Sequence, residues 1–156
     1  MKNLNLILDD EDEEIITWGL VRLSKHLPDY ELFFHINQIN SNQFKRIDDL
    51  KISNTYYQHS YPRFEINIPE AKTCLQFIAN QSSEFKQIQE ITELFIEEEE
   101  TQWLLPTHKD VDYIIKTSDT FADFSVILLP ESLLFQIQDY RLSSNDELYQ
   151  LIQYYE

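Results

Sequence analysis

The sequence predicts an α+β fold: one domain over residues 1–156, with a mostly antiparallel or mixed sheet and helices packed mainly on one face. The composition supports a folded domain, because 42% of the 156 residues are hydrophobic and 13% are aromatic. Strand-like alternation and helix-like spacing occur along the whole chain, and no repeat or linker divides it. Short turns between several predicted strands favour antiparallel neighbours.

The first 61 residues predict two strands and one helix. Alternating leucines over residues 4–8 predict a strand, and an acidic capping box after it predicts a helix over residues 10–27. A second strand is expected over residues 30–37, where apolar residues alternate with others. The polar stretch 39–61 predicts mostly irregular structure.

The middle of the chain predicts a hairpin followed by a helix. Alternation over residues 64–68 and 75–79 predicts two strands, and the short segment 69–72 predicts the turn between them. Apolar residues at helical spacing predict a helix over residues 84–99. A further strand is expected from Val111 onward.

The last third allows two interpretations at one place. Asp119 can cap a helix through residue 128, although the apolar run 126–129 also suits a buried strand. Alternation over residues 133–137 predicts the last strand, and Ser144 with Glu147 predicts the start of a final helix.

Charge and cysteine content restrict the partners and the compartment. The chain has 28 acidic and 12 basic residues and a net charge of -16, which disfavours direct binding to nucleic acid or to an anionic membrane surface. Basic proteins are candidate partners, because a strongly negative field speeds their encounter. The alternative is that the excess of acid only keeps the protein soluble. No apolar run reaches the ~18 residues of a membrane span, and the lone Cys74 is expected to be a small buried residue. We therefore expect a cytoplasmic protein.

Motifs for the common kinds of catalysis and cofactor binding are missing from the sequence. Gly19 is the only glycine, whereas phosphate-binding loops and the nucleophile elbow each need several. The four histidines match no zinc spacing. We therefore predict no catalytic, cofactor-binding or metal-binding residues and no cofactor.

One group of residues is an alternative to that prediction. His108, Asp110 and Asp112 are two residues apart, so an extended chain would place all three side chains on one face. Such a group could bind a metal ion or transfer a proton. Aspartates in turns more often bond to their own backbone, which favours a structural role.

A short motif precedes the strand at Val111. Leu105 and Pro106, followed after four residues by Val111, Asp112 and Tyr113, resemble the signature of the IPExxxVDY family of small uncharacterised Bacteroidota proteins. The resemblance covers residues 60–118 and includes the block 75–80, which ends in an asparagine. It implies a bacterial cytosolic lineage and no known activity.

The chain departs from the signature at two positions. Leu105 replaces an isoleucine, and Thr107 replaces the glutamate that an acid-base role would need. We therefore expect a structural or interaction motif, in which Pro106 shapes a turn, Asp112 bonds to backbone donors and Tyr113 buries its ring. Tyr113 is expected to share a buried face with Val111 and Ile115, opposite Asp112 and Lys116.

These observations predict a small acidic cytosolic module that binds an unidentified protein, basic or amphipathic, without catalysis. Two alternatives remain. The first is a small enzyme or metal-dependent protein that uses His108, Asp110 and Asp112. The second is an acidic nucleic-acid mimic that occupies a DNA- or RNA-binding protein through carboxylates spaced like phosphates.

Overall fold

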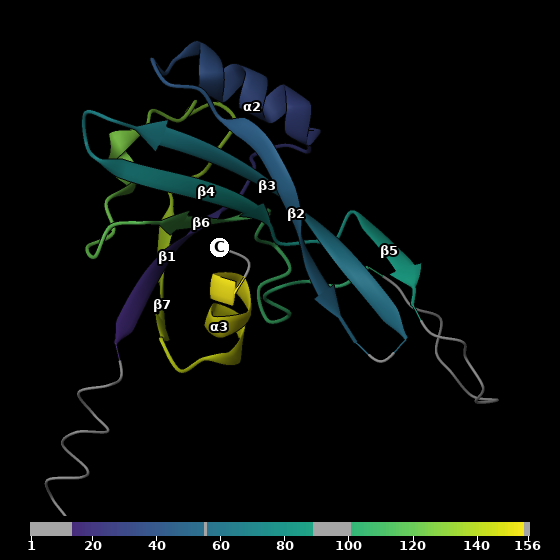
Figure 1. Cartoon of the computed structure of the whole chain (residues 1–156). Coiled ribbons are helices and arrows are strands. Elements are labelled where there is room, and N and C mark those ends of the chain that lie inside the picture. The colour runs from purple at the N-terminus through teal and green to yellow at the C-terminus, as the bar shows by residue number, and fades with distance from the viewer. Residues whose placement is uncertain (1–13, 55, 89–100, 155–156) are drawn as a thin grey trace, which may run out of the picture.

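An antiparallel sheet is the centre of the computed structural model, which describes residues 14–54, 56–88 and 101–154 (Figure 1). Its strands run in the order β2-β3-β4-β6-β1-β7, and β5 pairs with β3 outside that order. Every pairing between these strands is antiparallel, which confirms the predicted α+β class. The strands are β1 (Ile15–Val21), β2 (Lys45–Ser53), β3 (Tyr57–Ile68), β4 (Thr73–Ala79), β5 (Glu84–Gln87), β6 (Tyr113–Thr117) and β7 (Gln138–Ser143).

The long strand β3 holds two parts of the sheet together. Its residues 63–68 pair with β4, whereas its residues 57–60 pair with β5. On its other edge β3 pairs with β2, and the register shifts there between Ile47 and Leu50. This bulge and the charged side chains of β2 protect an edge strand from pairing with another chain. The part of β2 and β3 that lies beside β5 extends away from the rest of the sheet (Figure 1).

The α-helices of the described residues cover opposite faces of the sheet. Helix α2 (Asp29–Gln38) buries Leu32, Phe33 and Ile36 in a core with Phe77 of β4. Helix α3 (Glu147–Tyr154) buries Ile152 in a second core on the other face. The expectation that helices pack mainly on one face is therefore wrong, because each face of the sheet carries its own apolar set. The second core includes Trp18, Leu20, Leu50, Tyr61, Ile78, Leu104, Leu105, Val111, Ile114 and Leu142.

The predicted helix over residues 10–27 and the predicted strand over residues 30–37 are both wrong where the structure describes them. Residues 15–21 form β1, and residues 29–38 form α2. Because β1 is an inner strand and the two faces of the sheet are covered by the two cores, its residues 18–21 are buried on both faces, so the alternation typical of a strand is missing. In α2 the aromatic residues Tyr30 and Phe34 are exposed. Together with the buried Leu32 and Ile36 they put an apolar residue at every second position, which resembles the pattern of a strand. The predicted strand 4–8 and the capping box lie outside the described residues.

Two further expectations for the middle of the chain are wrong. The stretch 39–61 is mostly regular, because β2 and the start of β3 form a strand pair there. The helix expected from residue 84 is instead the four-residue edge strand β5, and residues 89–99 of that prediction lie outside the described part. The predicted hairpin is confirmed as β3 and β4, with a turn at Pro69 to Lys72. Lys72 takes a φ of 51° in that turn.

The last third of the chain is partly as expected. The strand near Val111 is confirmed as β6, and the final helix is confirmed as α3. Instead of a helix from Asp119 or a strand over 126–129, one turn of 3-10 helix spans Phe124–Val126, and the Asp123 carboxylate accepts from Ser125 N at its start. The expected strand over 133–137 is wrong, because β7 begins only at Gln138. Neither described helix has the length and apolar character that a membrane span requires.

The single glycine has a packing role in β1. An added Cβ at Gly19 would lie 2.8 Å from Ile137 Cγ2 and 3.1 Å from Phe124 Cε2. A side chain at this position would therefore push the segment between the 3-10 turn and β7 off the sheet.

Candidate functional site

The side chain of Asn80 organises the loop that carries the Leu105 to Tyr113 motif. Asn80 is completely buried just after β4. Its Nδ2 donates to the carbonyl oxygens of His108 at 2.9 Å and Val111 at 3.0 Å, and its Oδ1 accepts from Leu105 N at 2.8 Å. Its backbone N donates to Asp112 O, and its backbone O accepts from Leu104 N. The loop therefore closes around one asparagine whose hydrogen-bonding groups are all used.

Two consecutive turns shape the loop. His108 N donates to Leu105 O at 2.9 Å, and Val111 N donates to His108 O at 3.1 Å. Pro106 occupies the second position of the first turn, where its restricted φ is favourable. Leu105 and Val111 are buried on either side of these turns, while Pro106 is exposed. The expectation that Pro106 shapes a turn agrees with this geometry.

Asp112 attaches the loop to the end of β1. Its Oδ2 accepts from Leu23 N at 2.8 Å, and its backbone N donates to Val21 O at 2.8 Å. Burial raises the pKa of this carboxyl group, and the hydrogen bond from Leu23 N opposes that shift only in part. Asp112 thus bonds to a backbone donor, as its place in the motif predicts.

Tyr113 is buried as predicted, but not beside Val111. Its ring packs edge-on against Phe33 of α2, with ring centroids 5.7 Å apart, in the same core as Ile115. Burial raises the pKa of its phenol. Val111 belongs to the second core together with Ile114, because the turn ahead of β6 ends the alternation at that point. Lys116 does alternate away from Tyr113, yet it is buried, since both faces of the sheet are covered.

The alternative site residues His108, Asp110 and Asp112 bond to three different partners. His108 Nδ1 lies 2.9 Å from Thr107 Oγ1, and Asp110 Oδ2 accepts from Arg22 Nε at 2.6 Å. The bond to Arg22 lowers the pKa of Asp110. Across the described ranges, no group of three or more histidine, cysteine, aspartate or glutamate side chains is arranged to hold a metal ion.

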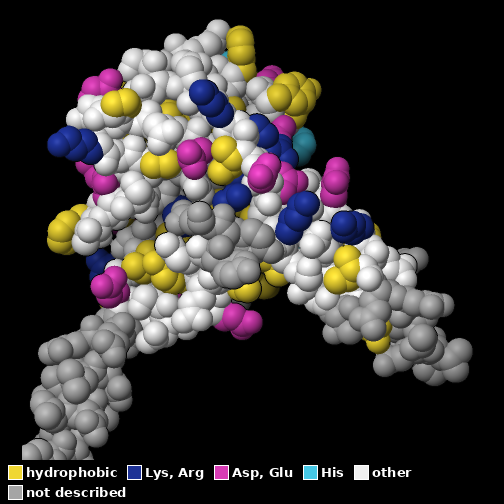
Figure 2. Space-filling model, in the orientation of Figure 1, with side chains coloured by type: hydrophobic (Ala, Val, Ile, Leu, Met, Phe, Trp, Pro, Cys, Tyr) yellow, Lys and Arg dark blue, Asp and Glu magenta, His cyan; other side chains and the backbone are white. Residues whose placement is uncertain are grey.

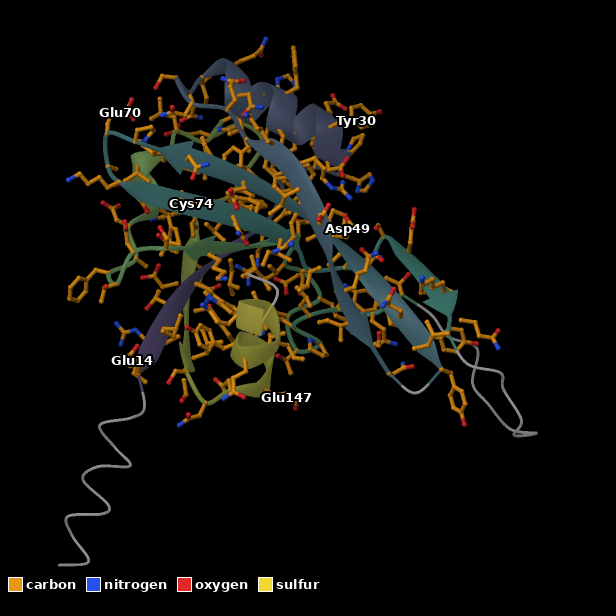
Figure 3. All side chains as sticks on the ribbon, in the orientation of Figure 1. Glu14, Tyr30, Asp49, Glu70, Cys74 and Glu147 are labelled. Atoms are coloured by element: carbon orange, nitrogen blue, oxygen red, sulfur yellow. The ribbon has the colours of Figure 1, made fainter. Side chains whose placement is uncertain are left out.

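Cys74 lies on β4 and is half-buried, so the expectation of a buried core residue is not met (Figure 3). It alternates with Leu75 and Phe77, which point into the core beneath α2, and therefore faces the opposite side of the sheet. Its backbone N donates to Ser118 Oγ at 2.9 Å.

Sequence reasoning missed several buried polar side chains on that opposite side of the sheet. Gln76 Nε2 donates to Glu65 Oε2 at 3.0 Å, and Arg63 Nε donates to Asp48 O in the bulge of β2 at 2.7 Å. Lys116 lies beside Gln76 in the strand register. Their alternation with apolar residues would normally indicate a solvent-facing side, so no local signal could reveal their burial.

The excess of acid is concentrated outside the described ranges. Those ranges hold 16 of the 28 acidic residues and 11 of the 12 basic residues, a net charge of -5, whereas the remaining segments carry -11. On the face shown in Figure 2, acidic and basic side chains are interspersed. This visible face therefore lacks the continuous row of carboxylates that nucleic-acid mimicry requires.

Comparisons with known proteins give no match. No family model, no curated protein and no solved structure matches the chain. The similarity of the Leu105 to Tyr113 motif to the IPExxxVDY signature therefore stays a prediction.

Proposed function

We propose that this chain is a non-enzymatic interaction module that binds a basic, amphipathic protein segment through the outer face of α2. One observation carries the proposal: Tyr30 is 75% exposed and Phe34 is 58% exposed on a helix whose inner face already completes a core. Figure 3 shows Tyr30 at the end of α2, directed away from the sheet.

The spacing of the two aromatic residues supports a shared contact surface. Residues four apart on a helix are neighbours, so Tyr30 and Phe34 form one patch. Exposed aromatic residues are enriched at binding sites, because a ring buries a large area at a low entropic cost. The folded core does not need them, since Leu32, Phe33 and Ile36 supply the buried contacts of α2.

Charge supports the basic character of the partner. Asp29 and Glu31 flank Tyr30 in the first turn of α2. The Asp29 carboxylate pairs with Arg46 Nη1 at 3.4 Å, whereas Glu31 forms no ion pair with any described residue. The net charge of -16 would speed the approach of a cationic segment, and salt would weaken that attraction.

The two alternative functions have less support. An enzyme or metal-dependent protein would need His108, Asp110 and Asp112 to converge, whereas their side chains bond to Thr107, Arg22 and Leu23. A nucleic-acid mimic would need a stripe of carboxylates, whereas charges of both signs alternate on the visible face (Figure 2). The same proposal includes membership of the IPExxxVDY family, which the motif from Leu105 to Tyr113 supports. It also includes a cytoplasmic location, which the single cysteine supports.

The test is chemical crosslinking and affinity capture with the wild-type protein and two variants. Tyr30→Ser with Phe34→Ser removes the patch, and Phe135→Ser is a matched control because Phe135 is 59% exposed elsewhere on the surface. We expect the same basic protein to be captured by the wild type and the control, to be lost from the double variant, and to be released by salt. Equal capture by all three proteins, or no capture at low salt, would contradict the proposal. Thermal melts should be nearly unchanged, because exposed substitutions typically shift stability by about 0.5 kcal/mol or less.

A further inference from the structure

A cavity of about 640 Å³ lies between the start of β1, the segment that follows β6, and one side of α3. Its volume is within the range of roughly 300 to 1,000 Å³ that is typical of small-molecule sites. It is remote from the α2 patch, because α3 and α2 cover opposite faces of the sheet.

The inner wall of the cavity carries two buried donors. Lys116 is 6% exposed and Trp18 is 1% exposed, and both line the cavity. Gly19 of β1 pairs with Ile115 of β6 in the antiparallel register. Trp18 and Lys116 are the next residues along these two strands and lie opposite each other, so their side chains share a face of the sheet. Trp18 Nε1 has no hydrogen-bond acceptor in the part of the chain that the structure describes. A buried donor without an acceptor is costly, and a bound acceptor group would remove that cost.

The outer part of the cavity has the opposite charge. Asp119 is half-buried and Glu14 is exposed, and both belong to the lining. Glu14 marks the start of β1 in Figure 3. Two aromatic residues complete the walls: Tyr149 of α3, whose ring centroid is 6.4 Å from that of Trp18, and Phe121, which is 86% exposed.

We propose that this cavity binds a free amino acid, with its carboxylate toward Lys116 and Trp18 and its ammonium group toward Asp119 and Glu14. A simple anion would meet the two carboxylates on the way in, and a simple cation would meet Lys116 at the inner wall. A zwitterion matches both ends, because each of its charges lies near groups of opposite sign. The rings of Tyr149 and Phe121 would contact its side chain.

Tryptophan fluorescence gives a direct readout of binding. The chain has two tryptophans, so in the Trp103→Phe protein the emission comes from Trp18 alone. Each of the protein amino acids other than tryptophan, whose own emission would mask that of Trp18, is titrated to about 10 mM or to its solubility limit, which covers the affinity of a weak specific site. We expect a saturable change with one or a few of them. For each that binds, the amide of its carboxyl group and the acid that lacks its amino group should bind about tenfold or more weakly.

Variants at both ends of the cavity test the assignment. Lys116→Met and Asp119→Asn should each weaken binding about tenfold, whereas Asp139→Asn, an exposed carboxylate outside the cavity, should leave it unchanged. Circular dichroism checks that each variant folds. If Lys116→Met unfolds, Asp119→Asn and the two ligand analogues decide. The proposal is overturned if no amino acid changes the Trp18 emission, if the deaminated acid binds as well as its parent, or if Asp119→Asn binds normally.

Discussion

Replacing Asn80 with alanine should strongly destabilise the fold, although the change removes few atoms. The substitution removes an acceptor from Leu105 N and donors from the carbonyl oxygens of Val111 and His108. His108 O keeps the bond from Val111 N, so two buried backbone groups, Leu105 N and Val111 O, lose the only hydrogen-bond partner they have among the described residues. Each such group costs about 1 to 3 kcal/mol, which predicts a loss of about 2 to 6 kcal/mol in the free energy of unfolding.

Urea unfolding of the wild type and the variant measures this loss. A domain of this size typically has a total stability of roughly 5 to 15 kcal/mol, so the midpoint should fall by a large fraction while the slope stays constant. Asn42→Ala is a matched control, because the Asn42 side chain makes one hydrogen bond within the described residues, to Glu70 Oε2 at 3.3 Å on the surface. We expect its cost to be about 0.5 kcal/mol or less.

The result that would refute the reasoning is an Asn80→Ala protein within about 1 kcal/mol of the wild type at an unchanged slope. That outcome would mean that water or a loop movement satisfies Leu105 N and Val111 O without Asn80. The loop of the motif would then not depend on the asparagine for its shape.

Three other predictions concern the same region of the sheet. Tyr113→Ala should cost about 3 to 5 kcal/mol in urea unfolding because it removes a buried ring, whereas Asp112→Ala should cost about 1 kcal/mol, since it removes a single bond to Leu23 N; equal costs would contradict the packing role of Tyr113. Gly19→Ala should cost about 1 to 3 kcal/mol, because its Cβ would lie 2.8 Å from Ile137 Cγ2, and a neutral effect in thermal melts would show that the segment yields freely. The raised pKa of Asp112 means that its ionised form is disfavoured in the folded state, so its contribution to stability is fully present below the ordinary value of 3.8 and is lost as the pH rises through the folded pKa. Asp112→Asn should therefore compare more favourably with the wild type at pH 7 than at pH 4 in urea unfolding, and an unchanged or reversed difference would show that burial does not govern this group.

Predictions from sequence were correct where the signal is local. The hairpin of β3 and β4 has alternating apolar residues on both sides of a short turn, and those neighbours in sequence are also neighbours in space. The final helix has a start signal and helical spacing within one segment. The α+β class followed from the presence of both patterns.

The same local signals were misleading where burial depends on distant partners. Residues 18–21 of β1 are all buried because β6, β7 and the two cores surround that strand. Their apolar run therefore showed no alternation, and apolar residues at spacing four resembled a helix. In α2 the exposed Tyr30 and Phe34 completed a false strand pattern.

The candidate sites divide in the same way. The sequence by itself determined that the motif from Leu105 to Tyr113 contains a turn and buries a tyrosine, because proline geometry and apolar character act over a few residues. Only the tertiary structure decided that Asn80 holds this loop and that Lys116 and Trp18 line a cavity with Asp119. Those groups come from strands and loops far apart in the chain, and their register in the sheet, which depends on pairing across it, brings them together.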